Sequence, residues 1–129
     1  MDFRAARMKA QVKDALDQQL QAMGIEAKKI YTGRQKHTSN IEVITEDSRA
    51  EPFYYGEIFD HTDGLITNIK DVALVIKVAD CAPVLLYDPV HQVQANLHAG
   101  WRGTVGRIIS KAVKIMEESY GSDRRDILA

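Results

Sequence analysis

The sequence predicts an α+β fold in which a mixed β-sheet, built around one hairpin, packs against helices. Three observations predict it: an apolar stripe of helical spacing near the N-terminus, several short strand-like segments in the middle, and a second helical stripe near the C-terminus. A chain of 129 residues can bury one moderate core, so we expect a single domain over residues 1–129.

The first predicted helix covers residues 3–23, and Gly24 supplies a natural C-terminal stop. Short strands are expected at residues 28–32 and 41–46, joined by a polar loop that contains His37. The apolar stripe of the helix consists of Met8, Val12, Leu16, Leu20 and Met23.

Residues 47–62 show no clear period but are rich in apolar rings, so we expect them to fold over another part of the chain. Strands are expected at residues 64–67 and 72–78. The second is nearly continuous in apolar residues, which predicts burial on both faces. The rings and their apolar neighbours are Phe53, Tyr54, Tyr55, Ile58 and Phe59.

The C-terminal part begins with a hairpin whose strands cover residues 83–87 and 92–97. A long helix follows from Thr104 and ends at Gly121. Its apolar stripe consists of Val105, Ile108, Ile109, Ala112, Val113, Met116 and Tyr120.

Composition is that of an ordinary globular protein, with 45% hydrophobic residues, 27% charged residues and a net charge of -1. This balance gives no electrostatic reason to expect nucleic acid as a partner. No apolar run approaches the roughly 18 residues that a membrane span requires, and the N-terminus is charged rather than signal-like. We therefore expect a cytoplasmic protein with small-molecule partners and no membrane contact.

The only cysteine, Cys81, cannot form an internal disulfide, so it is a free thiol, a metal ligand or a nucleophile. If the hairpin turn is centred between Pro89 and Val90, Cys81 lies directly opposite His98. Opposed Cβ atoms are about 4.5–5.5 Å apart, close enough for the two side chains to share a metal or a proton. A lone cysteine in a strand is usually a small core residue, but the polar neighbours here favour function.

Those neighbours are Asp80 and the segment that follows His98. Asp80 points to the other face from Cys81, so we expect it to orient a backbone group or a histidine. Arg102 and the N–H groups at the start of the last helix can converge on an anion such as phosphate. Alternatively, the glycines of this segment only permit a tight turn and Trp101 fills the core.

A zinc or copper site would need a third ligand besides the cysteine and His98. The candidates are His37, His61 and His91. His91 lies in the hairpin turn, far from the Cys81 end, and is interpreted as solvated. Spacing alone does not choose between His37 and His61.

Two runs, residues 79–88 and 98–103, closely resemble the bacterial laccase-domain family, also called multicopper polyphenol oxidoreductases and purine nucleoside phosphorylases. Residues 63–67 resemble the Asp-Ala/Gly-Leu-Val/Ile-Thr segment of that family, and residues 35–37 resemble its Gln-x-His-Gly motif. The resemblance covers about residues 30–129. It implies a layered α/β/β/α, YfiH-like fold, here incomplete.

The resemblance also implies a metal site formed by His37, Cys81 and His98, with zinc as the metal and copper as an alternative. The implied activity is phosphorolysis of adenosine, inosine, guanosine and methylthioadenosine, with deamination of adenosine. Copper-linked phenol oxidation is a further implied activity. In this interpretation Arg102 and the helix N-terminus hold phosphate, and Asp80 supports the ligands. Thr38 stands where the family usually has glycine.

Family members usually have an N-terminal strand with an arginine-glycine motif and continue past residue 129 into a glycine-proline segment. Neither feature is found in this sequence, so the chain is expected to be the middle of the family fold.

Two rival functions remain open. Cys81 as nucleophile and His98 as its base would make a cysteine hydrolase acting on cell-wall peptide precursors. Alternatively, the chain keeps the metal site without catalysis and serves as a binding or self-associating module, with the aromatics of residues 53–59 exposed.

Overall fold

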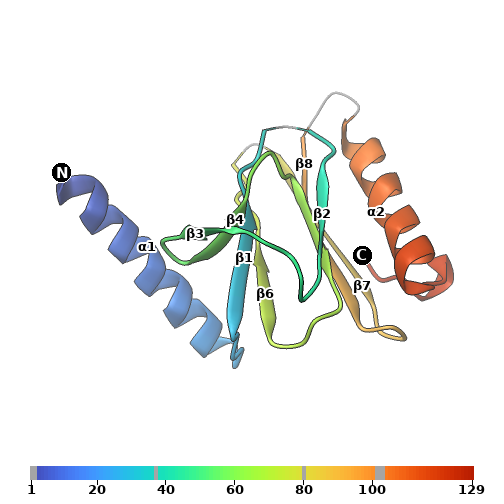
Figure 1. The fold of residues 1–129 in the computed structure, drawn as a ribbon, viewed down its shortest axis with the longest axis horizontal. Helices are drawn as coiled ribbons and strands as arrows, with labels where there is room; N and C mark the ends of the chain where they lie inside the picture. The colour runs from blue at the N-terminus through green and yellow to red at the C-terminus, as the bar shows by residue number, and fades with distance from the viewer. Residues whose placement is uncertain (1–2, 37, 80, 101–103) are drawn as a thin grey trace.

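The computed structural model describes residues 3–36, 38–79, 81–100 and 104–129. Two long helices, α1 (Phe3–Ala22) and α2 (Thr104–Tyr120), flank two four-stranded sheets in this part of the chain (Figure 1). From one side of Figure 1 to the other, the layers follow the order helix, sheet, sheet, helix. The predicted α+β class and its α/β/β/α layering are confirmed.

The first sheet has the strand order β3-β4-β1-β6. The central strand, β1 (Lys29–Gly33), pairs in parallel with β4 (Gly56–Phe59) on one side and with β6 (Val72–Val75) on the other. Strand β3 (Glu51–Phe53) pairs antiparallel with β4. The segment at residues 47–62, which has no clear period in the sequence, therefore contains a hairpin at one edge of this sheet.

The second sheet has the strand order β2-β5-β8-β7. Strand β2 (Ile41–Ile44) pairs in parallel with β5 (Gly64–Thr67). Strand β8 (Val93–Ala99) lies between β5 and β7 (Ala82–Asp88) and is antiparallel to both. The predicted hairpin is thus one half of a complete sheet rather than the centre of a single mixed one.

Helix α2 packs against one face of the second sheet, as its apolar stripe predicts. The shared core is fully apolar, which explains why the helix keeps this orientation along the sheet. Its buried members are Ile66, Leu86, Val93, Ala95, Leu97, Ala99, Ile108, Ala112 and Met116.

The opposite face of β8 is polar and is directed toward the first sheet. The side-chain amide of Gln94 donates to the carbonyl of Val72 over 3.0 Å, and that of Asn96 donates to the carbonyl of Leu74 over 3.0 Å. These two amides satisfy carbonyls on β6, the edge strand of the first sheet. His98 is the next residue on this face because side chains alternate along a strand.

Helix α1 begins and ends as predicted, and Gly24 follows it with a positive φ of 71°. However, none of its residues is buried, and Met8 and Val12 of its apolar stripe are 59% and 46% exposed. Neither helix in the described ranges has the length and apolar character that crossing a membrane requires.

Two expectations about burial are wrong. All of β6 is half-buried rather than buried on both faces, because it lies at a sheet edge. The side chains of Tyr55, Ile58 and Phe59 are buried, since the β3–β4 hairpin places them against the first sheet. Residues 53–59 therefore do not present the exposed aromatic surface that a binding module was expected to use.

Candidate functional site

The central polar group of the site is a buried pair, Asp63 and His98. Asp63 immediately precedes β5 and His98 lies near the end of β8, and the antiparallel pairing of these strands brings the two residues together. The backbone N–H of His98 donates to the carbonyl of Asp63 over 2.7 Å. Asp63 is 0% and His98 4% exposed, so both polar side chains depend on protein partners.

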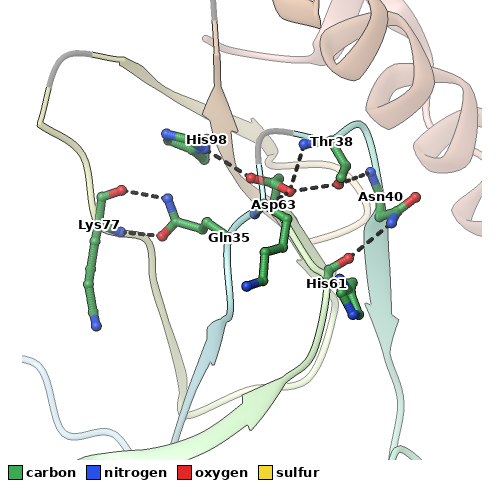
Figure 2. A network of polar contacts seen from close by, with 8 residues as sticks. Gln35, Thr38, Asn40, His61, Asp63, Lys77 and His98 are labelled. Atoms are coloured by element: carbon green, nitrogen blue, oxygen red, sulfur yellow. Dashed lines mark hydrogen bonds and ion pairs between the residues drawn. The ribbon is translucent and has the colours of Figure 1, made fainter.

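The Asp63 carboxylate divides its two oxygens between two parts of the chain (Figure 2). Oδ1 lies 3.0 Å from His98 Nδ1. Oδ2 accepts hydrogen bonds from the Lys36 N–H at 3.2 Å, the Thr38 N–H at 3.0 Å and the Thr38 hydroxyl at 2.6 Å. One carboxylate thus joins His98 to the loop that follows β1.

Burial raises the pKa of Asp63, but the hydrogen bonds from Thr38, His98 and Lys36 oppose it, and the net pKa lies below the ordinary value. Asp63 is therefore a carboxylate at neutral pH. A carboxylate only accepts hydrogen bonds, so His98 Nδ1 carries the hydrogen that faces it. The lone pair of the neutral ring is then on Nε2, the nitrogen that can bind a metal or accept a proton.

The hairpin register differs from the predicted one. Strands β7 and β8 pair Pro83 with His98, so the predicted direct opposition of Cys81 and His98 is wrong by two residues. The loop is displaced because the Asp88 carboxylate accepts the N–H of Val90 over 2.9 Å and Gln92 adopts a positive φ of 54°.

A slip of two residues keeps the same face of the sheet. Cys81 directly precedes β7 and lies in a bend of the chain, just outside the β7–β8 register, which ends at the pair Ala82–Ala99. Cys81 is a half-buried free thiol.

Four residues singled out in the sequence are not described by the structure. They are His37, Asp80, Trp101 and Arg102. Within the described ranges, no group of three or more histidine, cysteine or acidic side chains is arranged to hold a metal. The predicted three-ligand site therefore still depends on His37.

The other two histidines are not brought to the Asp63–His98 pair. His61 is exposed, and its Nε2 lies 3.8 Å from Asp60. His91 lies in the hairpin turn as predicted, but its Nδ1 is 2.8 Å from the buried Asp88 carboxylate. The His91 ring is nevertheless exposed, which agrees with its interpretation as a solvated side chain.

Gln35 holds the site loop to the segment that leads toward Cys81. Its side-chain amide donates to the Lys77 carbonyl over 2.6 Å and accepts the Lys77 N–H over 2.9 Å (Figure 2). The loop after β1 and the segment after β6 are consequently fixed relative to each other at the end of the sheets that carries His98.

The sequence reasoning missed the role of Asp63 and assigned the orienting function to Asp80. The sequence offers a partial signal, because Asp63 directly precedes residues 64–67, an apolar run expected to be a strand, although it does not name the partner of Asp63. A carboxylate at the entrance to such a strand is removed from water and needs donors.

The two-sheet α+β fold holds a buried carboxylate–histidine pair near the end of the inner strand β8, an arrangement that orients an imidazole in many metal and acid–base sites. A family model described as multi-copper polyphenol oxidoreductase laccase matches residues 2–129, and the chain belongs to this family.

Named relatives agree with this assignment. The chain is 38% identical over 96 residues to the purine nucleoside phosphorylase YlmD of Bacillus subtilis, and the aligned stretch covers 74% of this chain and 34% of that protein. It is 35% identical over 95 residues to the adenosine deaminase RL5 of an unknown prokaryotic organism, and that alignment covers 73% of this chain and 36% of RL5.

Among solved structures, the chain matches the hypothetical protein YfiH of Bacillus licheniformis with a TM-score of 0.79 and 30% identity, covering 92% of this chain and 45% of that one. The chain thus spans about a third of the length of these curated relatives and under half of the solved structure.

Proposed function

We propose that this chain carries the zinc site of a purine nucleoside phosphorylase that also deaminates adenosine. The observation that carries the proposal is the buried Asp63–His98 pair, which gives His98 the ring orientation typical of a metal-binding histidine. The similarity to a named purine nucleoside phosphorylase and a named adenosine deaminase supports the choice of reactions.

The proposed ligand atoms are Nε2 of His98, the sulfur of Cys81 and a ring nitrogen of His37. Imidazole nitrogen and thiolate sulfur are the donors that zinc prefers, and three protein ligands leave one position open. When bound, zinc would supply Lewis acidity that makes water reactive near neutral pH. Copper, which binds the same donors, is the alternative metal.

In the proposed phosphorolysis, a phosphate oxygen bonds to C1′ of the ribose while the bond from C1′ to the purine nitrogen breaks. The products are ribose 1-phosphate and the free base, which takes up a proton. Arg102 and the N-terminus of α2 would hold the phosphate. In the proposed deamination, water adds at C6 of adenosine and ammonia leaves, giving inosine. Inosine, guanosine and methylthioadenosine are the other proposed substrates of phosphorolysis, and the cytoplasm is the proposed compartment.

The first test is metal content by plasma mass spectrometry on protein purified without chelators or a histidine tag. About one zinc per chain, lost in Cys81→Ala, is expected from the three-ligand site. Chromatography of adenosine and phosphate incubations should then yield adenine or inosine above the level of a His98→Ala control. Copper in place of zinc would favour the oxidoreductase alternative, and metal-free, well-folded protein would contradict the proposal.

The same pair also favours a second candidate, the cysteine hydrolase. An aspartate that orients a histidine is two thirds of a nucleophilic triad, in which Cys81, directly before β7, would be the nucleophile and His98 its base. This candidate predicts activity that survives chelators and a Cys81 that iodoacetamide labels faster than a free thiol. Slow labelling would count against it.

A further inference from the structure

We infer that Thr38 is a positioning residue that sets the ring orientation and tautomer of His98 through Asp63. The inference deepens the proposed function, because it concerns a side chain proposed as a ligand, but it rests on hydrogen bonds within the chain. Thr38 stands in the loop that joins β1 of the first sheet to β2 of the second, and His98 lies on β8 of the second sheet.

The direction of the Thr38 hydroxyl is fixed by its two neighbours. The backbone N–H of Asn40 donates to Thr38 Oγ1 over 3.1 Å, which occupies a lone pair of that oxygen. Asp63 Oδ2 lies 2.6 Å from Oγ1 and has only lone pairs to offer as a carboxylate. The hydroxyl hydrogen therefore points at Asp63.

The carboxylate is in turn held in one rotation. Oδ2 receives three hydrogen bonds, from the Thr38 hydroxyl, the Thr38 N–H and the Lys36 N–H. Rotating the carboxylate would break charge-assisted bonds, each of which contributes about 1.5–3 kcal/mol. Oδ1 thus stays directed at His98 Nδ1, and the ring keeps its hydrogen on that nitrogen.

The donors to Oδ2 come from the residues on either side of His37 in the sequence. One carboxylate consequently fixes both the loop that contains His37 and the ring of His98. Thr38 supplies the only side-chain donor to Oδ2 among the described contacts. A substitution at Thr38 can therefore weaken the link between the loop and the His98 ring while the Asp63 carboxyl group stays in place.

The test compares Thr38→Val, which removes the hydroxyl, with Thr38→Ser, which keeps it. Thr67→Val is a matched control, because the Thr67 hydroxyl donates to the Ile44 carbonyl over 3.0 Å and accepts the Ile69 N–H over 3.1 Å. Thr67 lies at the other end of β5 from Asp63, so its removal tests loss of a buried hydroxyl without touching the site.

The first readout is the nitrogen-15 spectrum of the His98 ring in metal-free protein near neutral pH, assigned with a His98→Asn variant. Wild type, Thr38→Ser and Thr67→Val should show one tautomer with hydrogen on Nδ1. Thr38→Val should show exchange with the Nε2–H tautomer. A wild-type ring with hydrogen on Nε2 would overturn the inference, even if Thr38→Val failed to fold.

The second readout is zinc affinity by competition with a chromogenic chelator. Thr38→Val should bind zinc more weakly, by less than the about 10–100-fold that loss of a histidine's direct outer partner costs, while Thr38→Ser and Thr67→Val stay near wild type. Equal spectra and affinities for Thr38→Val and wild type would refute the inference. Wild-type protein that binds no zinc would instead refute the proposed function, and the spectrum alone would then decide the role of Thr38.

Discussion

Replacing Asp63 with asparagine should invert the tautomer of His98. In the Asp63→Asn variant, the side-chain amide oxygen would stay with its donors from Lys36 and Thr38, which leaves the amide nitrogen facing the imidazole. An amide nitrogen donates, so His98 Nδ1 must then accept and the ring hydrogen moves to Nε2. The nitrogen proposed to bind metal or take a proton loses its lone pair.

The stability cost follows from the four hydrogen bonds that the carboxylate receives from Lys36, Thr38 and His98. Bonds to a charged group contribute about 1.5–3 kcal/mol and neutral ones about 0.5–1.5 kcal/mol, so each loses about 1 kcal/mol. Relief from burying a charge offsets part of this loss. We expect Asp63→Asn to lower the free energy of unfolding by about 2–4 kcal/mol.

Urea unfolding would measure the stability change, and the nitrogen-15 spectrum of the His98 ring would measure the tautomer. Asp60→Asn is a suitable control, because its carboxylate is exposed, forms long ion pairs, at 3.7 Å to Arg34 and 3.8 Å to His61, and accepts the His61 N–H over 3.1 Å, a bond that the amide oxygen of asparagine can keep. Such pairs contribute at most about 1 kcal/mol. An Asp63→Asn protein with the hydrogen still on Nδ1 and stability equal to that of Asp60→Asn would refute the reasoning.

Three further predictions concern the core, acid stability and the metal. Ile108→Ala should lower the free energy of unfolding, measured with urea, by about 2–5 kcal/mol, because the side chain is fully buried between α2 and the second sheet. Val90→Ala on the exposed hairpin turn is the control and should change this free energy by less than about 0.5 kcal/mol. The pKa of Asp88 lies below its ordinary value of 3.8. The hydrogen bond from Ser122 lowers this pKa most, burial opposes that effect, and hydrogen bonds from His91 and backbone N–H groups lower it further. Its stabilising contribution is therefore complete at neutral pH and is lost as the pH falls below that ordinary value toward the folded pKa. The melting temperature of wild type should consequently fall more steeply in acid than that of Asp88→Asn, and parallel curves for the two proteins would contradict this prediction. A chelator should abolish the proposed phosphorolysis and added zinc should restore it, whereas phosphorolysis that survives the chelator would contradict the zinc site.

The helices could be predicted from the sequence because the responsible signals are local. Their apolar stripes repeat at helical spacing, and Gly24 and Gly121 adopt the positive φ values, 71° and 74°, that end them. The strand positions were also close, since each short apolar run is bounded by turn residues. The position of His98 near the end of a strand is confirmed, while its chemical role stays a prediction.

What could not be predicted depends on contacts between distant segments. The hairpin register is set by Asp88, whose carboxylate bonds not only to its own turn but also to Ser122 beyond α2. The division into two sheets, and hence the half-burial of β6, follows from which strands pair, a property that no single run of residues encodes. Asp63 was missed for the same reason, because its partner His98 lies on another strand.

These distant contacts make the site dependent on how the two sheets pack. On the inward face of β8, Gln94 and Asn96 bind the backbone of β6 in the first sheet, and His98 binds Asp63 in the second. The loop that completes the Asp63 environment follows β1, the central strand of the first sheet. That loop joins β1 to β2, and its Asn40 carbonyl accepts the N–H groups of Asp63 and Gly64, so the Thr38 donors are also tied to Asp63 within the second sheet. The orientation of the His98 ring therefore depends on contacts with both sheets, whereas the apolar core against α2 is formed by the second sheet and the C-terminal part of the chain.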